Sequence, residues 1–264
     1  MVYYPLSLLM RAGIREVLII STPRDLPAFR ELLGSGERFG MTFSYCEQPQ
    51  PEGLAQAFIL GRDFLDGSPA CLVLGDNILH GSNLSTMLGE CATITDGARI
   101  FGYRVRDPER YGVVEFDDTG RALSIEEKPA EPKSHFAVPG LYFYGPDVCD
   151  FAAGLKPSKR GELEITDLNR LYLDQGRLTV EVLERGYAWL DAGTHRSLIE
   201  ASNFIQAIEE RQGLKVGCLQ EIAWYRGWIT TERFRSEVEE AGSSTYGSYL
   251  AEVLARAESN VADR

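Results

Sequence analysis

The sequence predicts an α/β protein with a doubly wound, mostly parallel sheet, an added β-hairpin and a small helical appendage at its carboxyl end. The main observation is that short apolar stretches alternate with amphipathic helical stretches along the first 213 residues. Such an order favours parallel strands, because each crossover helix returns the chain to the same end of the sheet. A second observation is the turn Asp118-Thr119-Gly120, which lies between two stretches of alternating apolar and polar residues. A third is that after Gly213 the strand-like stretches give way to charged amphipathic ones.

The expected elements of the first half begin with a helix. Residues 5–13 are apolar at helical spacing and end at Gly13, which is typical of the position just after a helix. In the strand expected at residues 41–48, Phe43 and Tyr45 are two positions apart and therefore lie on one face. The remaining elements expected in this half are helices at 26–34 and 53–65 and strands at 15–22, 70–76 and 99–105.

The second half starts with the hairpin, which we expect at residues 111–129. Strands are then expected at 136–145 and 178–184, and helices at 162–176 and 195–213. The last helix has the strongest signals, with Thr194 as an N-cap and Gly213 past its end. Its apolar stripe is Leu198, Ala201, Ile205 and Ile208.

Composition divides the chain into an α/β domain at residues 1–213 and a helical segment at residues 214–264. After "EIAWYRGWI", two charged amphipathic stretches at roughly 230–240 and 246–258 predict short helices. The aromatic residues Trp224, Tyr225 and Trp228 are equally compatible with a core and with an interface between subunits.

Length, charge and cysteine content exclude several classes of protein. The chain has 264 residues and a formal net charge of −12, which argues against a general binder of nucleic acid or of anionic membranes. No apolar stretch approaches the ~20 residues that span a bilayer, and residues 1–5 do not open a signal peptide. Five cysteines without a C-x-x-C pair fit a reducing cytoplasm best.

Two aspartates follow expected strands. Asp76 comes after the apolar stretch of "CLVLGDN", and Asp191 ends "GYAWLD". In open α/β sheets, ligands bind beyond the carboxyl ends of the strands, and Mg²⁺ prefers one or two carboxylates together with phosphate oxygens. The sequence therefore suggests a Mg²⁺ site. The alternative is that each aspartate only shapes a turn or caps a helix, and spacing alone does not bring the two together.

Two further stretches combine groups suited to a sugar nucleotide. In "SIEEKP", Lys128 can neutralise a phosphate while Glu127 accepts hydrogen bonds from sugar hydroxyls, although a solvated charge cluster at a strand end is the better explanation of the stretch taken alone. In "EQPQPEGLAQA", the amide of Gln48 can pair with the edge of a pyrimidine, and Gly53 opens a helix. A glutamine on a proline-rich surface loop is the simpler interpretation of the second stretch.

A resemblance to a known family supports the functional interpretation of these stretches. The matching segments include "GLAQAF", "LVLGDNI", "DPERYGVVEFD", "SIEEKPAEPKS", "GLYFY", "RGELEITDLNR", "GYAWLDAGTH" and "SLIEASNFIQAIEERQGLKV". Together they resemble bacterial glucose-1-phosphate thymidylyltransferase, also called dTDP-glucose pyrophosphorylase, from Met1 to about Ile222. The resemblance implies a Rossmann-like nucleotidyltransferase sheet and a homotetramer in the cytoplasm, with a second nucleotide site between subunits.

The implied reaction is a Mg²⁺-dependent nucleotidyl transfer. The phosphate of glucose 1-phosphate attacks the α-phosphorus of dTTP, which releases pyrophosphate and forms dTDP-glucose for rhamnose or another deoxysugar route. By the same resemblance, Asp76 and Asp191 hold the metal, while Gln48 and Gly53 bind thymine. The sugar phosphate is bound by Tyr111, Gly112, Glu127, Lys128, Val138, Arg160 and Trp189.

The sequence departs from the family pattern at two places. The family begins with a strand and a loop of the form G-G-x-G-T-R-L-x-P, which binds the triphosphate, and these residues do not precede "YYPL" here. We expect the neighbouring strands to keep unpaired backbone groups, and the chain as printed to have little transferase activity. In "AVPGLYFY", Pro139 replaces a non-proline residue and removes an N–H donor beside the sugar pocket.

Several functions stay open from the sequence. A start codon assigned downstream of the true one and a natural fragment both explain the first departure. A non-catalytic subunit that binds a sugar nucleotide and regulates a partner also explains it. Within the enzyme class, a UTP-using uridylyltransferase is the alternative, because Gln48 alone does not discriminate thymine from uracil.

Overall fold

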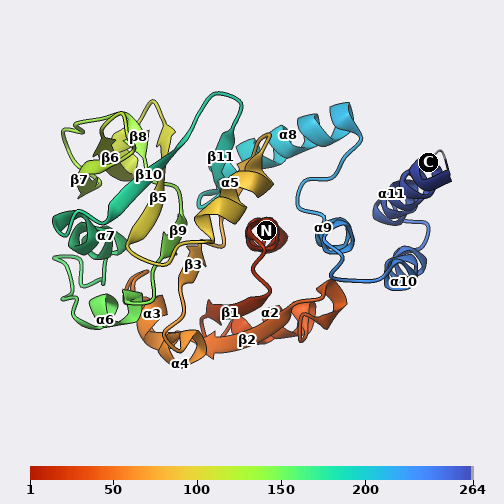
Figure 1. Cartoon of the computed structure of the whole chain (residues 1–264), viewed down its shortest axis with the longest axis horizontal. Coiled ribbons are helices and arrows are strands. Elements are labelled where there is room, and N and C mark those ends of the chain that lie inside the picture. The colour runs from red at the N-terminus through yellow and green to blue at the C-terminus, as the bar shows by residue number, and fades with distance from the viewer. Residues whose placement is uncertain (263–264) are drawn as a thin grey trace.

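The computed structural model describes residues 1–262, and these residues form one mixed sheet with two smaller ladders beside it (Figure 1). In the large sheet the strand order is β3-β9-β5-β8-β6-β7, and β10 pairs with β5. Its strands are β3 (Ala70–Val73), β5 (Ala98–Arg104), β6 (Gly112–Phe116), β7 (Ala122–Glu127), β8 (Phe136–Ala137), β9 (Leu141–Tyr144) and β10 (Leu178–Leu183). The small ladders join β1 (Glu16–Ser21) to β2 (Thr42–Glu47) and β4 (Asn77–His80) to β11 (Ala188–Asp191).

Helices cover the strands and extend beyond them. Figure 1 shows α1 between the β1–β2 ladder and α5, with α8 along the opposite side of the molecule. The α-helices before residue 214 are α1 (Tyr3–Ala12), α2 (Leu26–Leu33), α3 (Gln56–Leu60), α4 (Arg62–Leu65), α5 (Leu84–Cys91), α6 (Val148–Ala153), α7 (Ile165–Asp174) and α8 (His195–Gln212). Two 3-10 turns, η1 (Glu37–Phe39) and η2 (Pro108–Arg110), complete this part.

The α/β class predicted from the sequence is confirmed, but the sheet is more mixed than expected. Among the named strands of residues 1–262, the parallel pairs are β1–β2 and β5–β10, whereas the pairs that involve β3, β4, β6, β7, β8, β9 or β11 are antiparallel. The reason is that β9 lies between β3 and β5 and is antiparallel to both. Strand order and direction depend on such long-range pairing, which apolar patterns do not encode.

Predictions from local sequence signals, such as turns and helix caps, were more accurate than the prediction of strand direction. The hairpin is formed by β6 and β7, and Asp117 accepts hydrogen bonds from the backbone N–H groups of Thr119 and Arg121 in its turn. Thr194 caps α8 by accepting from the N–H of Ser197, and Gly213 follows α8 in the left-handed conformation. The helix expected at 53–65 is instead divided at Gly61, and the strand expected at 136–145 is divided around residues 138–140.

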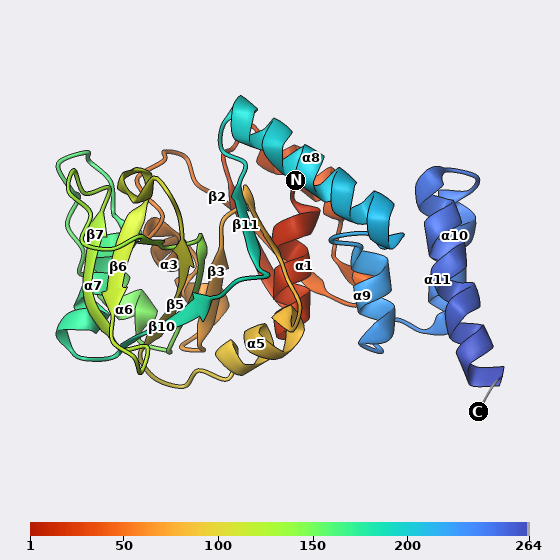
Figure 2. The same cartoon turned by 90° about the horizontal axis from the view of Figure 1, so that it is seen from above.

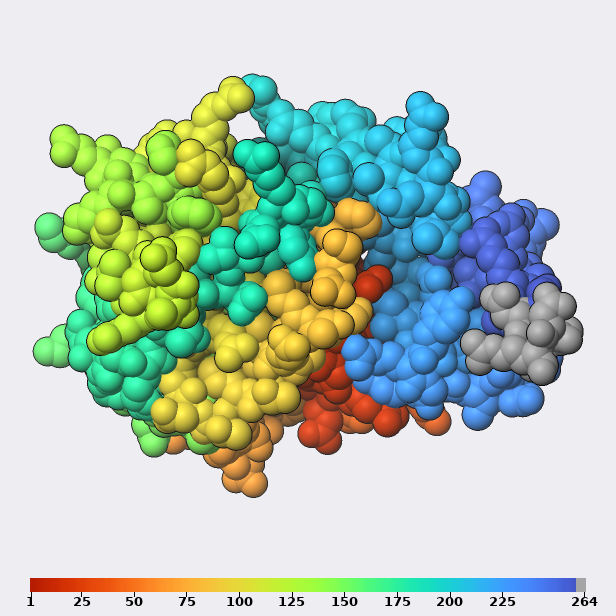
Figure 3. All heavy atoms as spheres, turned by 45° about the horizontal axis from the view of Figure 1, so that its top comes forward, coloured from red at the N-terminus to blue at the C-terminus, as the bar shows by residue number. Residues whose placement is uncertain are grey.

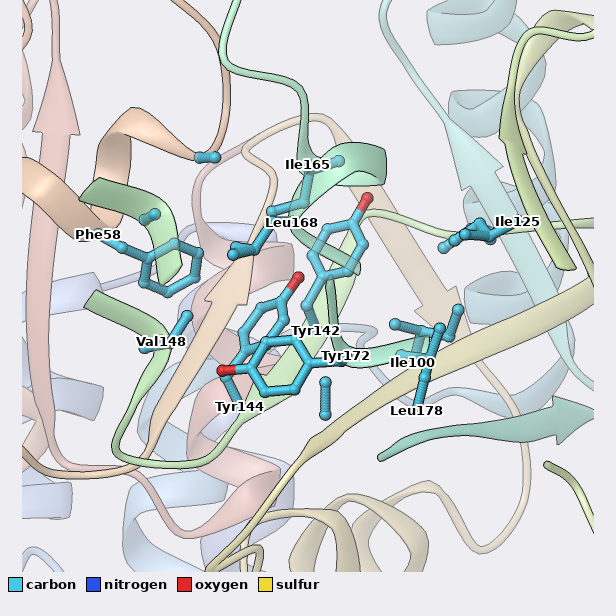
Figure 4. Close-up of a cluster of buried hydrophobic side chains, with 14 of the residues drawn as sticks. Phe58, Ile100, Ile125, Tyr142, Tyr144, Val148, Ile165, Leu168, Tyr172 and Leu178 are labelled. Carbon is cyan, nitrogen blue, oxygen red and sulfur yellow. The ribbon is translucent and has the colours of Figure 1, made fainter. Parts of the chain in front are cut away.

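The main core lies between the large sheet and helices α3, α6 and α7 (Figure 4). Tyr144 and Tyr172 are fully buried, with ring centroids 5.6 Å apart, and Phe58 packs edge-on against Tyr144. The buried hydroxyls have partners, since Tyr144 donates to Asn169 and Tyr172 donates to Asp147. This core fixes α7, whose first residues follow the segment that contains Arg160.

The C-terminal helices are α9 (Leu219–Tyr225), α10 (Thr231–Ala241) and α11 (Thr245–Ala262), which confirms the predicted helical appendage. They share a core with α1, β1 and β2, and they lie at one end of the molecule (Figure 2). In this core Trp224 stacks on Phe234 at 4.5 Å, whereas Tyr225 is exposed. The space-filling view shows these C-terminal residues, in blue, in contact with the body of the protein (Figure 3).

A cavity of about 1030 Å³ separates the β1–β2 ladder from the large sheet. It is lined by β1 on one side and β3 on the other, with residues of α1 and of α3–α4 completing its walls. Neither strand pairs with a named strand on the side that faces the cavity, because β1 pairs only with β2 and β3 only with β9. The expectation that neighbouring strands keep an unpaired edge is therefore confirmed for the described residues.

One buried carboxylate links the C-terminal helices to the N-terminal half. Glu237 on α10 has no exposed side-chain surface, and its two oxygens accept hydrogen bonds from Arg38 at 2.5 Å and Arg233 at 2.7 Å. Gln220 of α9 also donates to Glu237, at 3.3 Å. Because an unpaired buried charge is costly, this group ties α10 to η1.

We expect Arg38→Ala to lower the free energy of unfolding by about 3 kcal/mol, because Glu237 loses one of its two charged partners. Urea unfolding followed by circular dichroism measures this change. Arg24→Ala is the control, since Arg24 is almost fully exposed and its pair with Asp25 spans 4.0 Å. Equal stability of the two variants would contradict a structural role for the Arg38–Glu237 pair.

Candidate functional site

The β4–β11 ladder brings the two predicted metal ligands together. Asp76 is the residue before β4, and Asp191 is the last residue of β11 and lies opposite Asn77. The N–H of Ala192 donates to the backbone carbonyl of Asp76 at 2.9 Å, which extends the ladder by one more bond. The two carboxylates therefore lie at the same end of the ladder although they are far apart in sequence.

Gly193 shows how close the carboxylates are. A Cβ atom on this residue would lie 3.0 Å from Oδ2 of Asp76 and 3.1 Å from Oδ1 of Asp191. The Gly193 N–H donates to the same Oδ1 of Asp191 at 3.1 Å. Gly193 is favoured here by space rather than by an unusual backbone angle, because a side chain would press against both acids and move them by a few tenths of an ångström. Sequence reasoning missed this residue, although "LDAGT" contains it.

The carboxylate pair fits a hard divalent cation. Two carboxylates that face one small space match the preference of Mg²⁺ for one or two acidic ligands, with substrate phosphates and water completing its coordination. Among residues 1–262 the structure has no cluster of three or more histidine, cysteine, aspartate or glutamate side chains that could hold a metal. Two carboxylates would leave the other coordination positions of such a cation to phosphate oxygens and water.

The hairpin β6–β7 supplies a second group of predicted residues. Gly112 lies opposite Glu127 in the ladder, and the carbonyl of Gly112 accepts from the N–H of Val138 at 2.8 Å. The N–H of Lys128 donates to the carbonyl of Tyr111 at 3.0 Å. The five predicted sugar-phosphate residues of this region, Tyr111, Gly112, Glu127, Lys128 and Val138, thus lie together.

Glu127 is held by a residue that the sequence did not single out. The hydroxyl of Thr166, near the start of α7, donates to Oε2 of Glu127 at 2.6 Å. The other oxygen, Oε1, lies 3.8 Å from Arg160 and 4.0 Å from Lys128. One carboxylate oxygen is therefore fixed by Thr166, while the other faces two cations.

Lys128 has a backbone conformation that is unusual for its type. Its φ of 42° lies in the left-handed region, where residues other than glycine are strained. Such strain is concentrated at functional sites, since the surrounding structure must maintain it. The Lys128 side chain is half exposed, so its ammonium group is available to an anion.

Arg160 is bound more tightly to acids than the sequence suggested. Glu164, the N-cap residue of α7, accepts two hydrogen bonds from its guanidinium, at 3.0 Å and 2.8 Å. Burial raises the pKa of Glu164, but the hydrogen bonds from Arg160 and Ser158 outweigh it, and the pKa lies below its usual range. A phosphate that binds Arg160 would share the guanidinium with Glu164, so the predicted phosphate contact stays a prediction.

Trp189 of β11 connects the two groups of residues. Its indole is buried and packs edge-on against Tyr111, with 5.0 Å between the ring centroids, and against Tyr103 at 5.9 Å. The indole Nε1–H donates to Oδ1 of Asn77 at 2.6 Å. The N–H of Gly140 donates to the same Oδ1 at 2.9 Å, and Nδ2 of Asn77 donates to Asp76 at 2.9 Å.

Pro139 lies in this region without leaving a gap in the hydrogen bonding. The N–H groups on either side of it both have acceptors, because Val138 donates to Gly112 and Gly140 donates to Asn77. The carbonyl of Pro139 accepts from Leu141 at 2.8 Å. The lost donor at Pro139 therefore does not disturb the contacts of its neighbours.

The predicted base-binding residues lie on the loop after β2. Gln48 donates to Oε1 of Gln56 at 2.6 Å, which fixes the orientation of its amide. Gly53 has φ 110°, and a Cβ there would lie 2.4 Å from the carbonyl oxygen of Leu163. The glycine is therefore needed where this loop meets the segment before α7. Its proposed approach to a base stays a prediction.

Two further groups near the carboxylates were not found from the sequence. Arg110 lies 5.3 Å from the ring centroid of Tyr111 and donates to Asp107 at 2.7 Å, and this hydrogen bond raises the pKa of the guanidinium, with a smaller contribution from the charge of Asp191. Burial raises the pKa of Tyr142, and the charges of Glu127 and Asp76 raise it further. The neutral phenol of Tyr142 thus lies within the electrostatic reach of both acids.

Comparisons with known proteins agree on one family. The family model described as nucleotidyl transferase matches residues 1–208. The chain is 55% identical over 256 residues to a glucose-1-phosphate thymidylyltransferase of Xanthomonas campestris, which covers 97% of this chain and 87% of the relative. It is 54% identical to the protein of that name from Mycolicibacterium smegmatis, with 97% and 88% covered.

Solved structures show the same likeness. A crystal structure from Bacillus anthracis, described as a glucose-1-phosphate thymidylyltransferase with bound sucrose, is 38% identical with a TM-score of 0.70. The match covers 77% of this chain and 81% of that one. A UDP-glucose pyrophosphorylase with UDP-glucose has a TM-score of 0.63 and 24% identity, over 80% of this chain and 86% of that one. This second likeness shows the fold alone.

Gly193→Ala should weaken binding of Mn²⁺, a paramagnetic substitute for Mg²⁺, by about tenfold or more, because the new methyl group separates the carboxylates. Titration of free Mn²⁺ by electron paramagnetic resonance measures this. Gly89→Ala is the matched control, since nothing lies within 4 Å of a Cβ at that helical position. Unchanged Mn²⁺ affinity in Gly193→Ala would contradict the idea that the cation is held in the narrow space between the two carboxylates at Gly193.

The Glu164–Arg160 pair predicts a pH dependence of stability. Because the pKa of Glu164 is lowered by folding, its stabilising contribution is complete above the ordinary value of 4.5 and is lost as the pH falls through the lowered value. We expect the melting temperature of the wild type to exceed that of Glu164→Gln at pH 7, and the difference to shrink between about pH 5 and 3. A constant difference across this range would contradict the assigned ionisation.

Proposed function

This chain belongs to the glucose-1-phosphate thymidylyltransferase family of nucleotidyl transferases, and on that premise we propose that it forms dTDP-glucose and pyrophosphate from dTTP and glucose 1-phosphate. In this reaction the sugar phosphate attacks the α-phosphorus of the nucleotide in line with the leaving pyrophosphate. The observation that most supports the proposal is the β4–β11 ladder, which joins a carboxylate pair to the sugar-side residues of the hairpin.

Asp76 and Asp191 are the residues that would hold Mg²⁺. When bound, the cation supplies charge neutralisation to the phosphate oxygens. Around this pair, the protein contributes its own cations. Arg110 is held by Asp107 next to Tyr111, and the half-exposed ammonium group of Lys128 lies beside Glu127 of the hairpin. These groups can orient two anionic substrates that would otherwise repel each other.

The hairpin residues provide groups suited to a sugar. Oε2 of Glu127 is held by Thr166, so the carboxylate has a fixed orientation in which it can accept a hydroxyl donor. Trp189 packs edge-on against Tyr111, which precedes Gly112 in the chain, and the backbone of Val138 is hydrogen-bonded to Gly112. A rigid set of an acceptor and an apolar wall favours one orientation of the ring, which brings its phosphate toward the carboxylate pair.

The nucleotide preference is the finer part of the proposal. An amide such as that of Gln48 can both donate to and accept from the edge of a pyrimidine, and its orientation is fixed by Gln56. This pairing edge is common to thymine and uracil. UTP is therefore the alternative nucleotide, and only a side-by-side comparison separates the two.

The test is Mg²⁺-dependent release of pyrophosphate with glucose 1-phosphate and either dTTP or UTP. It is performed on the 264-residue chain and on a version extended upstream to the next in-frame start codon. We expect turnover with dTTP to exceed turnover with UTP. Turnover by the extended version alone would support the proposal together with the expected low activity of the shorter chain. Turnover by neither would overturn the proposal, and binding of dTDP-glucose without turnover would favour a regulatory subunit.

Asp76→Asn and Asp191→Asn should each lower kcat by about two to three powers of ten, because each removes one negative ligand from the proposed metal site. Pyrophosphate release at saturating substrates measures the loss, and circular dichroism checks the fold. Asp118→Asn, in the exposed hairpin turn, is the control. Near-normal rates in both site variants would exclude this pair as metal ligands.

A further inference from the structure

The geometry points to Asn77 as a positioning residue that couples the proposed metal site to the sugar pocket. Asn77 is buried, with 3% of its surface exposed, and its amide makes three hydrogen bonds, to the preceding Asp76, to Gly140 and to Trp189. We propose that this amide sets the orientation of the Asp76 carboxylate and the position of the sugar-pocket wall together. The inference rests on the proposed function, which assigns the metal to Asp76 and the sugar to that wall.

The bond to Asp76 fixes the rotation of the carboxylate. Nδ2 of Asn77 donates to Oδ1 of Asp76 at 2.9 Å. The other oxygen, Oδ2, is the one that approaches Gly193 and therefore faces Asp191. One oxygen is thus held by the amide while the other is presented to the cation. Groups that hydrogen-bond to a metal-binding carboxylate, without touching the metal themselves, orient the carboxylate and change its affinity for the metal.

The bonds on the opposite side of the amide reach the sugar pocket. Oδ1 of Asn77 accepts from the indole Nε1–H of Trp189 at 2.6 Å and from the backbone N–H of Gly140 at 2.9 Å. Trp189 packs against Tyr111, and Gly140 follows Val138 by two positions. A displacement of Trp189 or of Gly140 therefore acts on the Asn77 amide, which also holds Asp76.

The backbone of Asn77 strengthens this coupling. Asn77 is the first residue of β4 and lies opposite Asp191 in the ladder, so its main chain is fixed by the strand that contains the second carboxylate. Gly140 also packs closely, because a Cβ on it would lie 2.9 Å from Nδ2 of Asn77. The glycine at position 140 therefore lets the backbone come close to the amide, which its three hydrogen bonds hold in one orientation.

The test is Asn77→Ala, with Mn²⁺ binding measured by electron paramagnetic resonance on the 264-residue chain. We expect the Mn²⁺ affinity to fall by about 10- to 100-fold while the carboxylates themselves are intact. Asn169→Ala is the matched control, since Asn169 is equally buried and its side chain accepts a hydrogen bond from Tyr144 in the main core. We expect this control to lose stability and to keep its Mn²⁺ affinity.

Trp189→Phe tests the coupling without touching Asn77 or either acid. It keeps an aromatic ring and removes the donor to Asn77. We expect a smaller loss of Mn²⁺ affinity than in Asn77→Ala, and no further loss when the two substitutions are combined, because both act through one group. Additive losses in the double variant, or unchanged affinity in Asn77→Ala, would overturn the proposal.

Turnover distinguishes this proposal from the function on which it rests. In whichever version of the protein turns over, Asn77→Ala should lower kcat by about 10- to 100-fold with little change in KM for dTTP. Turnover by the wild type together with wild-type kinetics in Asn77→Ala would refute the role of Asn77 alone. Absence of Mn²⁺ binding in the wild type, seen as an undiminished signal of free Mn²⁺, would refute the metal site and this role with it, whereas the pyrophosphate assay reports on the proposed function separately.

Discussion

The antiparallel register between β4 and β11 is the constraint on which the site depends. It places Asp191 opposite Asn77, so the two acids and Trp189 meet although more than a hundred residues separate the strands. A strand that slips by one residue presents the opposite face, which would turn Asp191 away from Asp76. The ladder has only four residues on each strand, so the aromatic packing of Trp189 and the bond from Ala192 help to specify its register.

Much of the fold was predictable from local signals, because turn and cap chemistry acts over a few residues. Asp117 in the hairpin turn, Thr194 before α8 and Gly213 after it all have the roles that their residue types predict. The parallel character of the sheet was overestimated, since the position of β9 between β3 and β5 results from pairing between distant segments. The helix at 53–65 is interrupted because Gly61 weakens it at that point.

The predicted site residues were selected by charge and by resemblance, and both criteria favour groups that touch a ligand. Residues that act through another residue have no such signal. Asn77 follows Asp76 directly in "LGDN", yet only the folded chain shows that its amide also reaches Trp189 and Gly140. Gly193 also has no signal in the sequence, because it matters by leaving space between Asp76 and Asp191, which come together only in the folded chain. Arg160 shows the opposite case, in which a plausible phosphate ligand is already bound by Glu164.

The cavity between β1 and β3 has a consequence for how the molecule opens. Among residues 1–262 the β1–β2 ladder is a separate sheet, so its attachment to the large sheet depends on side-chain packing. Helix α1 provides much of this packing, since Leu6 and Leu9 join the core of β1–β2 and the C-terminal helices, while Leu8 and Ala12 join the core beside β4 and α5. Two sheets joined in this way can exchange their amide protons as separate cooperative units, with α1 as the element common to both.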